Sequence, residues 1–216
     1  MAENMTPEPV REPILKAPWP VVALIGLLIG GYGVQSFLPP EQILPHLAFS
    51  SAGLAAGDWW VPVTALFLHG GWGHVLMNSA GVLAFGTPVA RYFGGTGRRI
   101  ALLAGFYLAC GTLANLGYGW VHAGQADMLV GASGAVSGLM AGAARLMGEG
   151  PKPAPFTSPP VIGMTLAWLV TNLLISIVGF APGAGGASVA WEAHLFGFAA
   201  GLVLFVPMSN MARAVT

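Results

Sequence analysis

The sequence predicts an all-α membrane protein with six transmembrane helices. Three observations support this prediction: few charged residues, six apolar segments, and basic residues confined to one side of the resulting topology. Of the 216 residues, 55% are hydrophobic and only 7% are charged, whereas a soluble domain carries about 25% charged residues. So few charges cannot cover the surface of a folded chain, and we expect a lipid bilayer to surround most of it.

Composition also limits the class of protein. The formal net charge is zero, which leaves no basic surface for nucleic acid. The single cysteine, Cys110, excludes an intrachain disulfide and a cysteine-rich metal site. Three glutamates and several prolines precede the first apolar run, a pattern unlike that of a cleavable signal peptide.

The six expected spans follow one another along the chain. A transmembrane helix needs about 20 mostly apolar residues, and the first such segment, 19–38, ends at a Pro-Pro pair, which cannot continue a helix. The other five segments are 74–92, 100–121, a short one at 133–147, 160–178 and 190–208. We therefore expect one transmembrane domain at 19–208, with tails at 1–18 and 209–216.

The basic residues test this topology, because six spans place all of them on one side of the membrane. They are Arg11, Lys16, Arg91, Arg98, Arg99, Arg145, Lys152 and Arg213. One span more or fewer would divide them between the two sides. Since cytoplasmic loops carry the excess of Lys and Arg, we expect an integral multi-pass membrane protein with both termini in the cytoplasm.

The first outer loop, 39–73, is unusually apolar for a segment in water. Its aromatic residues and histidines are Phe49, Trp59, Trp60, Phe67, Trp72, His46 and His69. Tryptophan is favoured at the membrane interface, so part of the loop is expected to lie there. Two interpretations remain open: a simple aromatic anchor, and a structured loop that supports a site.

Polar residues on three different spans fall at a similar depth. His74 and Asn78 open the second span, four residues apart and therefore on one helix face. Ser133 opens the fourth span, and His194 lies early in the sixth. These three spans all run from outside to inside, so the four side chains are expected near the outer end. Because polar groups inside a membrane are costly and usually functional or paired, the shared depth predicts a site.

Glycine spacing indicates how two of these spans approach each other. Glycines recur every four residues, as Gly134, Gly138 and Gly142 on the fourth span and as Gly197 and Gly201 on the sixth. Small residues at this spacing allow membrane helices to pack closely. If the two small-residue faces meet, the Ser133 hydroxyl and the His194 imidazole come within hydrogen-bond reach.

These residue types can perform acyl transfer. A serine hydroxyl becomes a strong nucleophile when a base takes its proton, and histidine is the usual base. The reaction also needs donors where the oxyanion forms. The side chains of His74 and Asn78 can donate, as can the backbone N–H of Ser133 at a helix N-terminus.

Structural interpretations compete with this hypothesis. Ser133 alone could be a helix cap, and His74 with Asn78 could be an interhelical hydrogen-bonded pair. His69 and His74 raise the question of a metal site, but no HExxH pattern or nearby carboxylate accompanies them, so we expect no metal. For Glu192 we favour an interface residue that reaches water over one that orients the sixth-span histidine.

Three motifs together resemble one family. They are "HGGWGHVLMN" at 69–78, "GASG" at 131–134 and "AHLFGFAAG" at 193–201. In these motifs and their order, the chain resembles the rhomboid family of intramembrane serine proteases. The resemblance covers about 19–208 and implies a six-transmembrane-helix rhomboid-like bundle.

The resemblance also implies roles. It makes Ser133 the nucleophile and His194 its general base, a dyad without an acid. It makes His74 and Asn78 the oxyanion-hole donors, and places the backbone of Gly131 close to the substrate. The implied substrates are transmembrane segments of other proteins, reached by water through an outward-opening cavity. The fifth span and the loop at 180–189 would serve as gate and cap, and no cofactor is implied.

The chain departs from the family pattern at three positions. Many members carry arginine where this chain has Val61, and glutamate where it has Ala90. Many carry an aromatic residue four positions after the nucleophile, against which the histidine stacks, and here that position is Ser137. The Ser137 hydroxyl either holds a water on His194 or bonds back to the carbonyl of Ser133; we favour the second.

Two other functions remain as alternatives. One is a catalytically inactive rhomboid-like protein that binds transmembrane helices. The other is an unrelated channel or transporter, although polar residues near one face of the membrane argue against it. We expect the protein in a bacterial inner membrane.

Cysteine labelling checks the topology. In a Cys110→Ser background, single cysteines in 40–60 and 181–188 should react with an impermeant maleimide added outside intact cells, and those in 93–98 and 149–156 should not. The reason is the one-sided distribution of basic residues. Opening the cells should expose the second group, and the reverse pattern would overturn the orientation.

Overall fold

The computed structural model describes residues 17–94, 97–148, 150, 152–178 and 189–213. Outside the described residues lie 1–16 of the expected N-terminal tail, 214–216 of the expected C-terminal tail and 180–188 of the expected cap loop. In the part of the chain that is described, the regular structure is helical, apart from one isolated antiparallel bridge between Phe49 and Leu129.

Long helices occupy all six segments predicted to be spans. They are α1 (Trp19–Gln35), the continuous α5 (Trp72–Gly81), η2 (Val82–Gly86) and α6 (Thr87–Phe93), then α7 (Gly97–Val121), α8 (Ser133–Ala144), α9 (Pro159–Val178) and α10 (Trp191–Arg213). The segment η2 is a π-helical turn within the second of these helices. The last helix continues to Arg213, beyond the end predicted at 208, because the apolar pattern does not mark where it stops.

Not every long helix has the length of a full span. By length and composition, three described helices can cross a membrane: Ile100–Val121, Pro159–Val178 and Trp191–Ala212. The apolar α1 has 17 residues and α8 has 12, both below the ~20 residues of a typical span. The count of six spans therefore stays a prediction.

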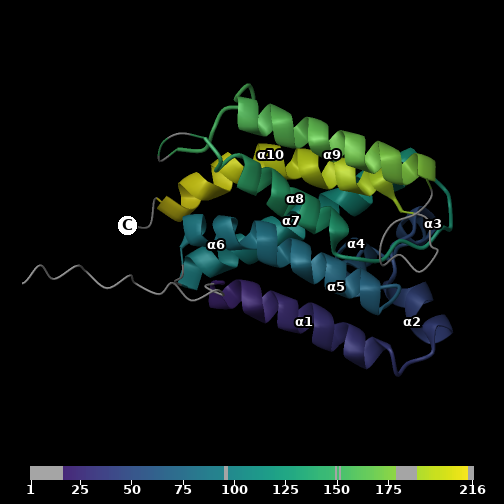
Figure 1. Ribbon diagram of the computed structural model, residues 1–216. Coiled ribbons are helices and arrows are strands. Elements are labelled where there is room, and N and C mark those ends of the chain that lie inside the picture. The colour runs from purple at the N-terminus through teal and green to yellow at the C-terminus, as the bar shows by residue number, and fades with distance from the viewer. Residues whose placement is uncertain (1–16, 95–96, 149, 151, 179–188, 214–216) are drawn as a thin grey trace, which may run out of the picture.

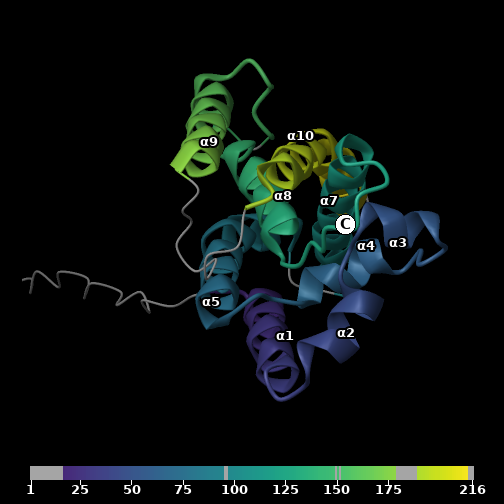
Figure 2. The same cartoon turned by 90° about the vertical axis from the view of Figure 1, so that its right-hand side faces the viewer.

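Helix α8 lies at the centre of the bundle, packed against α7, α10 and η2 (Figure 1). All of its residues after Ser133 are buried. Helices α1 and α9 lie on opposite flanks, and viewed along the bundle α9 lies to one side of α8 and α10 (Figure 2). A helix shorter than a typical span can occupy the centre because protein surrounds it.

Glycines bring α8 and α10 into backbone contact. A Cβ added at Gly197 would overlap the backbone of Gly134, and one added at Gly201 would overlap the backbone of Gly138. The prediction that the two small-residue faces meet is therefore confirmed.

The first outer loop is folded into short helices. These are α2 (Pro40–Leu47), α3 (Ser51–Ala55), α4 (Val61–Thr64) and η1 (Ala65–Phe67). Asn115 of α7 donates a hydrogen bond from Nδ2 to the carbonyl of Pro62 at 2.8 Å. Val61, the first of the three departures from the family pattern, is buried with Phe49 and Ala65. The loop is thus structured, while Trp59 remains 77% exposed, as an aromatic anchor requires.

Ala90, the second departure from the family pattern, lies inside the bundle. It is 4% exposed and belongs to a cluster with Phe93, Phe106 and Phe205. The centroid of the Phe93 ring lies 5.9 Å from the centroid of the Phe106 ring and 5.7 Å from that of the Phe205 ring. Aromatic packing therefore fills the region around Ala90.

Substituting Gly201 tests the backbone contact. Gly201→Ala should lower the melting temperature of the purified protein in detergent, because a methyl group forced into a packed interface costs about 1–3 kcal/mol. Gly163→Ala in α9 is the matched control, since a Cβ there has nothing within 4 Å and alanine favours a helix over glycine by about 0.8–1 kcal/mol. Equal melting temperatures for the two variants would contradict the close packing.

Candidate active site

A glycine with a positive φ lies two residues before the serine that begins α8. Gly131 has a φ of 123°, a backbone conformation that favours glycine. Its N–H donates to the carbonyl of Ala65 at 2.9 Å, which ties the segment to the outer loop. A Cβ at this position would lie 2.7 Å from Cε1 and Nε2 of His74. Both the conformation and the space therefore require glycine two residues before Ser133.

Ser133 and His194 form a hydrogen bond between helices. Ser133 is the first residue of α8, and His194 lies in the first turn of α10. The Ser133 Oγ is 2.9 Å from His194 Nε2. This approach depends on Gly197, one turn after the histidine, where the two backbones touch.

The side chains of His74 and Asn78 approach the same place from α5. The N–H of Gly70 lies 3.4 Å from His74 Nδ1, so Nδ1 acts as the acceptor and Nε2 carries the proton. Asn78 is 5% exposed. Among the described residues none accepts a hydrogen bond from its Nδ2. Two N–H donors are thus available beside Gly131.

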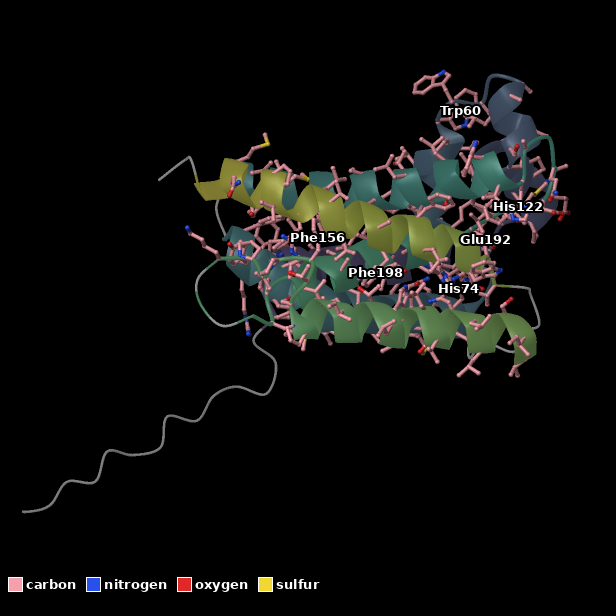
Figure 3. All side chains as sticks on the ribbon, turned by 90° about the horizontal axis from the view of Figure 1, so that it is seen from above. Trp60, His74, His122, Phe156, Glu192 and Phe198 are labelled. Carbon is pink, nitrogen blue, oxygen red and sulfur yellow. The ribbon has the colours of Figure 1, made fainter. Side chains whose placement is uncertain are left out.

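A cavity of about 470 Å³ joins these groups. Its lining includes all five residues selected from the sequence: His74, Asn78, Gly131, Ser133 and His194. Helices α5, α7, α8, α9 and α10 and the π-helical turn η2 all contribute lining residues, as do the segments before α5, α8 and α10. In Figure 3, His74 lies toward the same end of the bundle as Glu192, and Phe156 lies toward the other end.

Sequence reasoning missed Asn172 in α9. Its Oδ1 lies 2.8 Å from His194 Nδ1. Its Nδ2 donates to the carbonyl of Trp168, one turn earlier in the same helix, at 2.8 Å. The available signal was an asparagine within an expected span, since a polar side chain at that depth needs a partner.

Ser137 bonds back along its own helix. Its hydroxyl donates to the carbonyl of Ser133 at 2.8 Å, which confirms the favoured interpretation of this position. An aromatic neighbour for His194 comes instead from α9, because the Trp168 ring lies with its centroid 5.9 Å away at an interplanar angle of 37°. A different helix thus supplies the ring that many relatives carry four residues after the serine.

Glu192 bonds to another histidine. Its carboxylate Oε1 lies 3.2 Å from His122 Nε2, and the two side chains are adjacent in Figure 3. His122 Nδ1 in turn lies 3.1 Å from Gln125 Oε1. Glu192 therefore links α10 to the end of α7, and it is paired rather than directed freely into water.

The His69 ring packs against the ring of His74. It is 1% exposed and meets the His74 ring edge to face, with centroids 5.1 Å apart at 76°. Burial, with a smaller effect from His74, lowers the pKa of His69 to about 4, so the ring is neutral at neutral pH. Gln35 holds its backbone, accepting from the N–H at 3.0 Å and donating to the carbonyl at 2.8 Å.

Comparison with known proteins identifies relatives. A family model described as "Rhomboid domain" matches residues 56–211. "Putative rhomboid protease YdcA" of Bacillus subtilis (strain 168) is 31% identical over 124 residues, which are 56% of this chain and 59% of that protein. "RHOMBOID-like protein 9, chloroplastic" of Arabidopsis thaliana is 46% identical over 41 residues, 19% of this chain and 9% of that protein. The matches thus span less than two thirds of the length of either relative.

Proposed function

The chain belongs to the rhomboid family, and we propose that it is a serine endopeptidase that cleaves transmembrane segments of other membrane proteins. With its apolar helices it is a multi-pass membrane protein. We further propose that it lies in a bacterial inner membrane with both termini in the cytoplasm; the one-sided distribution of its basic residues supports this orientation.

The observation that carries the proposal is the hydrogen bond between Ser133 Oγ and His194 Nε2, at 2.9 Å beside a cavity. A serine that serves only as a helix cap would not need a histidine from a second helix. The pair has the geometry that a nucleophile and its general base require. It favours an active protease over an inactive protein that only binds helices.

The first half of the reaction forms an acyl-enzyme. Ser133 Oγ attacks the carbonyl carbon of the scissile peptide bond while His194 Nε2 takes the hydroxyl proton. The carbonyl oxygen becomes an oxyanion. When the C–N bond breaks, His194 gives its proton to the departing amine, and the acyl group stays on Ser133 as an ester.

The second half of the reaction hydrolyses the acyl-enzyme and restores the free Ser133 hydroxyl. A water molecule in the cavity gives a proton to His194 Nε2 and attacks the ester carbonyl. The second tetrahedral intermediate collapses, and His194 returns the proton to Ser133 Oγ as the carboxylic acid leaves. Each histidine protonation is thus reversed within one cycle.

The oxyanion is stabilised by donors that are already in place. The backbone N–H of Ser133 belongs to the first turn of α8, where N–H groups have no partner within the helix. The buried N–H donor Nδ2 of Asn78 has no hydrogen-bond acceptor among the described protein groups. His74 lines the same cavity and can donate from Nε2. Donors that do not reorganise during the reaction stabilise developing charge most effectively.

Replacing the nucleophile tests the proposed function. Ser133→Ala should lower cleavage of a fluorogenic transmembrane peptide in proteoliposomes by at least about 10⁴-fold, and should abolish labelling by a fluorophosphonate. Ser137→Ala is the matched control, because its hydroxyl bonds only within α8; it should retain both activities. Cleavage at the wild-type rate by Ser133→Ala would refute the mechanism.

Replacing Asn78 tests the oxyanion donors. Asn78→Ala should lower kcat about tenfold to a hundredfold with little change in KM, because the donor acts on charge that develops after binding. Loss of a single such donor elsewhere costs about 10²–10³-fold, and the remaining donors here share the load. Ser79→Ala, the next residue on α5 and also buried, should leave kcat unchanged. A raised KM with normal kcat would assign Asn78 to substrate binding instead.

A further inference from the structure

We infer that Asn172 is a positioning residue that fixes the tautomer and orientation of His194, so that the proposed dyad is completed by a neutral amide from α9. This inference rests on the proposed function, since it concerns how the same base is prepared. The sequence motifs lie on the other helices, and none of them includes this asparagine.

The orientation of the Asn172 amide follows from its own helix. The side chain is 1% exposed, and one end lies 2.8 Å from the carbonyl oxygen of Trp168. A carbonyl oxygen can only accept hydrogen bonds, so the NH₂ end of the amide must face it. The amide oxygen is then the atom that lies 2.8 Å from His194 Nδ1.

The amide oxygen in turn selects one tautomer of the histidine. Because Oδ1 can only accept, His194 Nδ1 must carry the proton. A neutral imidazole carries one N–H, so Nε2 keeps a free lone pair at 2.9 Å from Ser133 Oγ. This tautomer is the one that can take the serine proton. In the other tautomer, two lone pairs would face each other at 2.8 Å between Nδ1 and Oδ1.

The same turn of α9 also limits how the ring can tilt. Trp168 lies one turn before Asn172, and its ring is 5.9 Å from the His194 ring, centroid to centroid. The imidazole is therefore held by Ser133 at one nitrogen, by Asn172 at the other, and by an indole beside it. The position of His194 on α10 thus depends on side chains from both α8 and α9.

A merely structural role for Asn172 would have a different consequence. A buried amide that only joins α9 to α10 would change melting temperature when removed, and would leave the histidine tautomer as it was. The distinguishing measurement is therefore the protonation pattern of His194 in the resting protein, together with kcat and KM for a transmembrane peptide.

The experiment uses the full-length protein in detergent, labelled with ¹⁵N at histidine, with the His194 signals assigned by their loss in His194→Gln. Wild type should show a protonated Nδ1 and a bare Nε2. Asn172→Leu, which is similar in shape and lacks the acceptor, should lose this fixed pattern. Its kcat should fall about tenfold, the effect of one net hydrogen bond, with KM little changed.

Three further variants complete the comparison. Asn172→Asp keeps an acceptor oxygen toward Nδ1 but loses the donor to the Trp168 carbonyl, so it should restore the protonated Nδ1 and recover kcat only in part. Thr171→Val is the matched control, because the exposed Thr171 hydroxyl bonds only to the carbonyl of Ala167 in its own helix; it should match wild type. Asn172→Ala replaces the leucine variant if that protein does not fold.

A wild-type tautomer and wild-type kcat in Asn172→Leu would overturn the inference. So would a bare Nδ1 in the wild-type protein. Failure of the proposed function would look different, because the wild type would then neither cleave the peptide nor react with a fluorophosphonate. The NMR comparison needs no turnover and would still decide whether Asn172 sets the tautomer.

Discussion

The backbone contact between α8 and α10 is the constraint on which the rest of the structure depends. Two glycines on one helix face the backbone of two glycines on the other, and no side chain fits between them. Only at this separation does the hydroxyl of Ser133 reach the imidazole of His194 at 2.9 Å. Four glycines would weaken a helix in water, but in this bundle they allow the approach on which the site depends.

This packing also creates a small polar region inside an apolar bundle, where each polar group needs a hydrogen-bond partner. The hydroxyl of Ser137 bonds to its own helix, and the amide of Asn172 is shared between its own helix and His194. Asn78 Nδ2 differs, because no described protein group accepts from it. Leaving a buried donor unpaired costs about 1–3 kcal/mol, and the proposed reaction gives this donor an acceptor when the oxyanion forms.

The outer loop contributes to the site through its backbone. The carbonyl of Ala65 holds the N–H of Gly131, and Phe49 exchanges hydrogen bonds with Leu129 at 3.0 and 2.7 Å. These contacts fix the segment that leads into Ser133.

The sequence by itself predicted where the six long helical segments lie, because each is a long run of mostly apolar residues. It also predicted that Ser133, His194, His74 and Asn78 lie near one another, and all four line one cavity. The spacing of residues along one helix and the three motifs depend only on neighbouring positions in the chain, so the sequence alone reveals them.

Tertiary structure alone decided which side chains from different helices meet. The partner of His194 Nδ1 is Asn172, 22 positions earlier in the chain, and the partner of Glu192 is His122, 70 positions away. The ring beside His194 comes from Trp168 rather than from the position after the serine. These pairings depend on how each helix is rotated and tilted against its neighbours, which packing of the whole bundle sets and no single segment encodes.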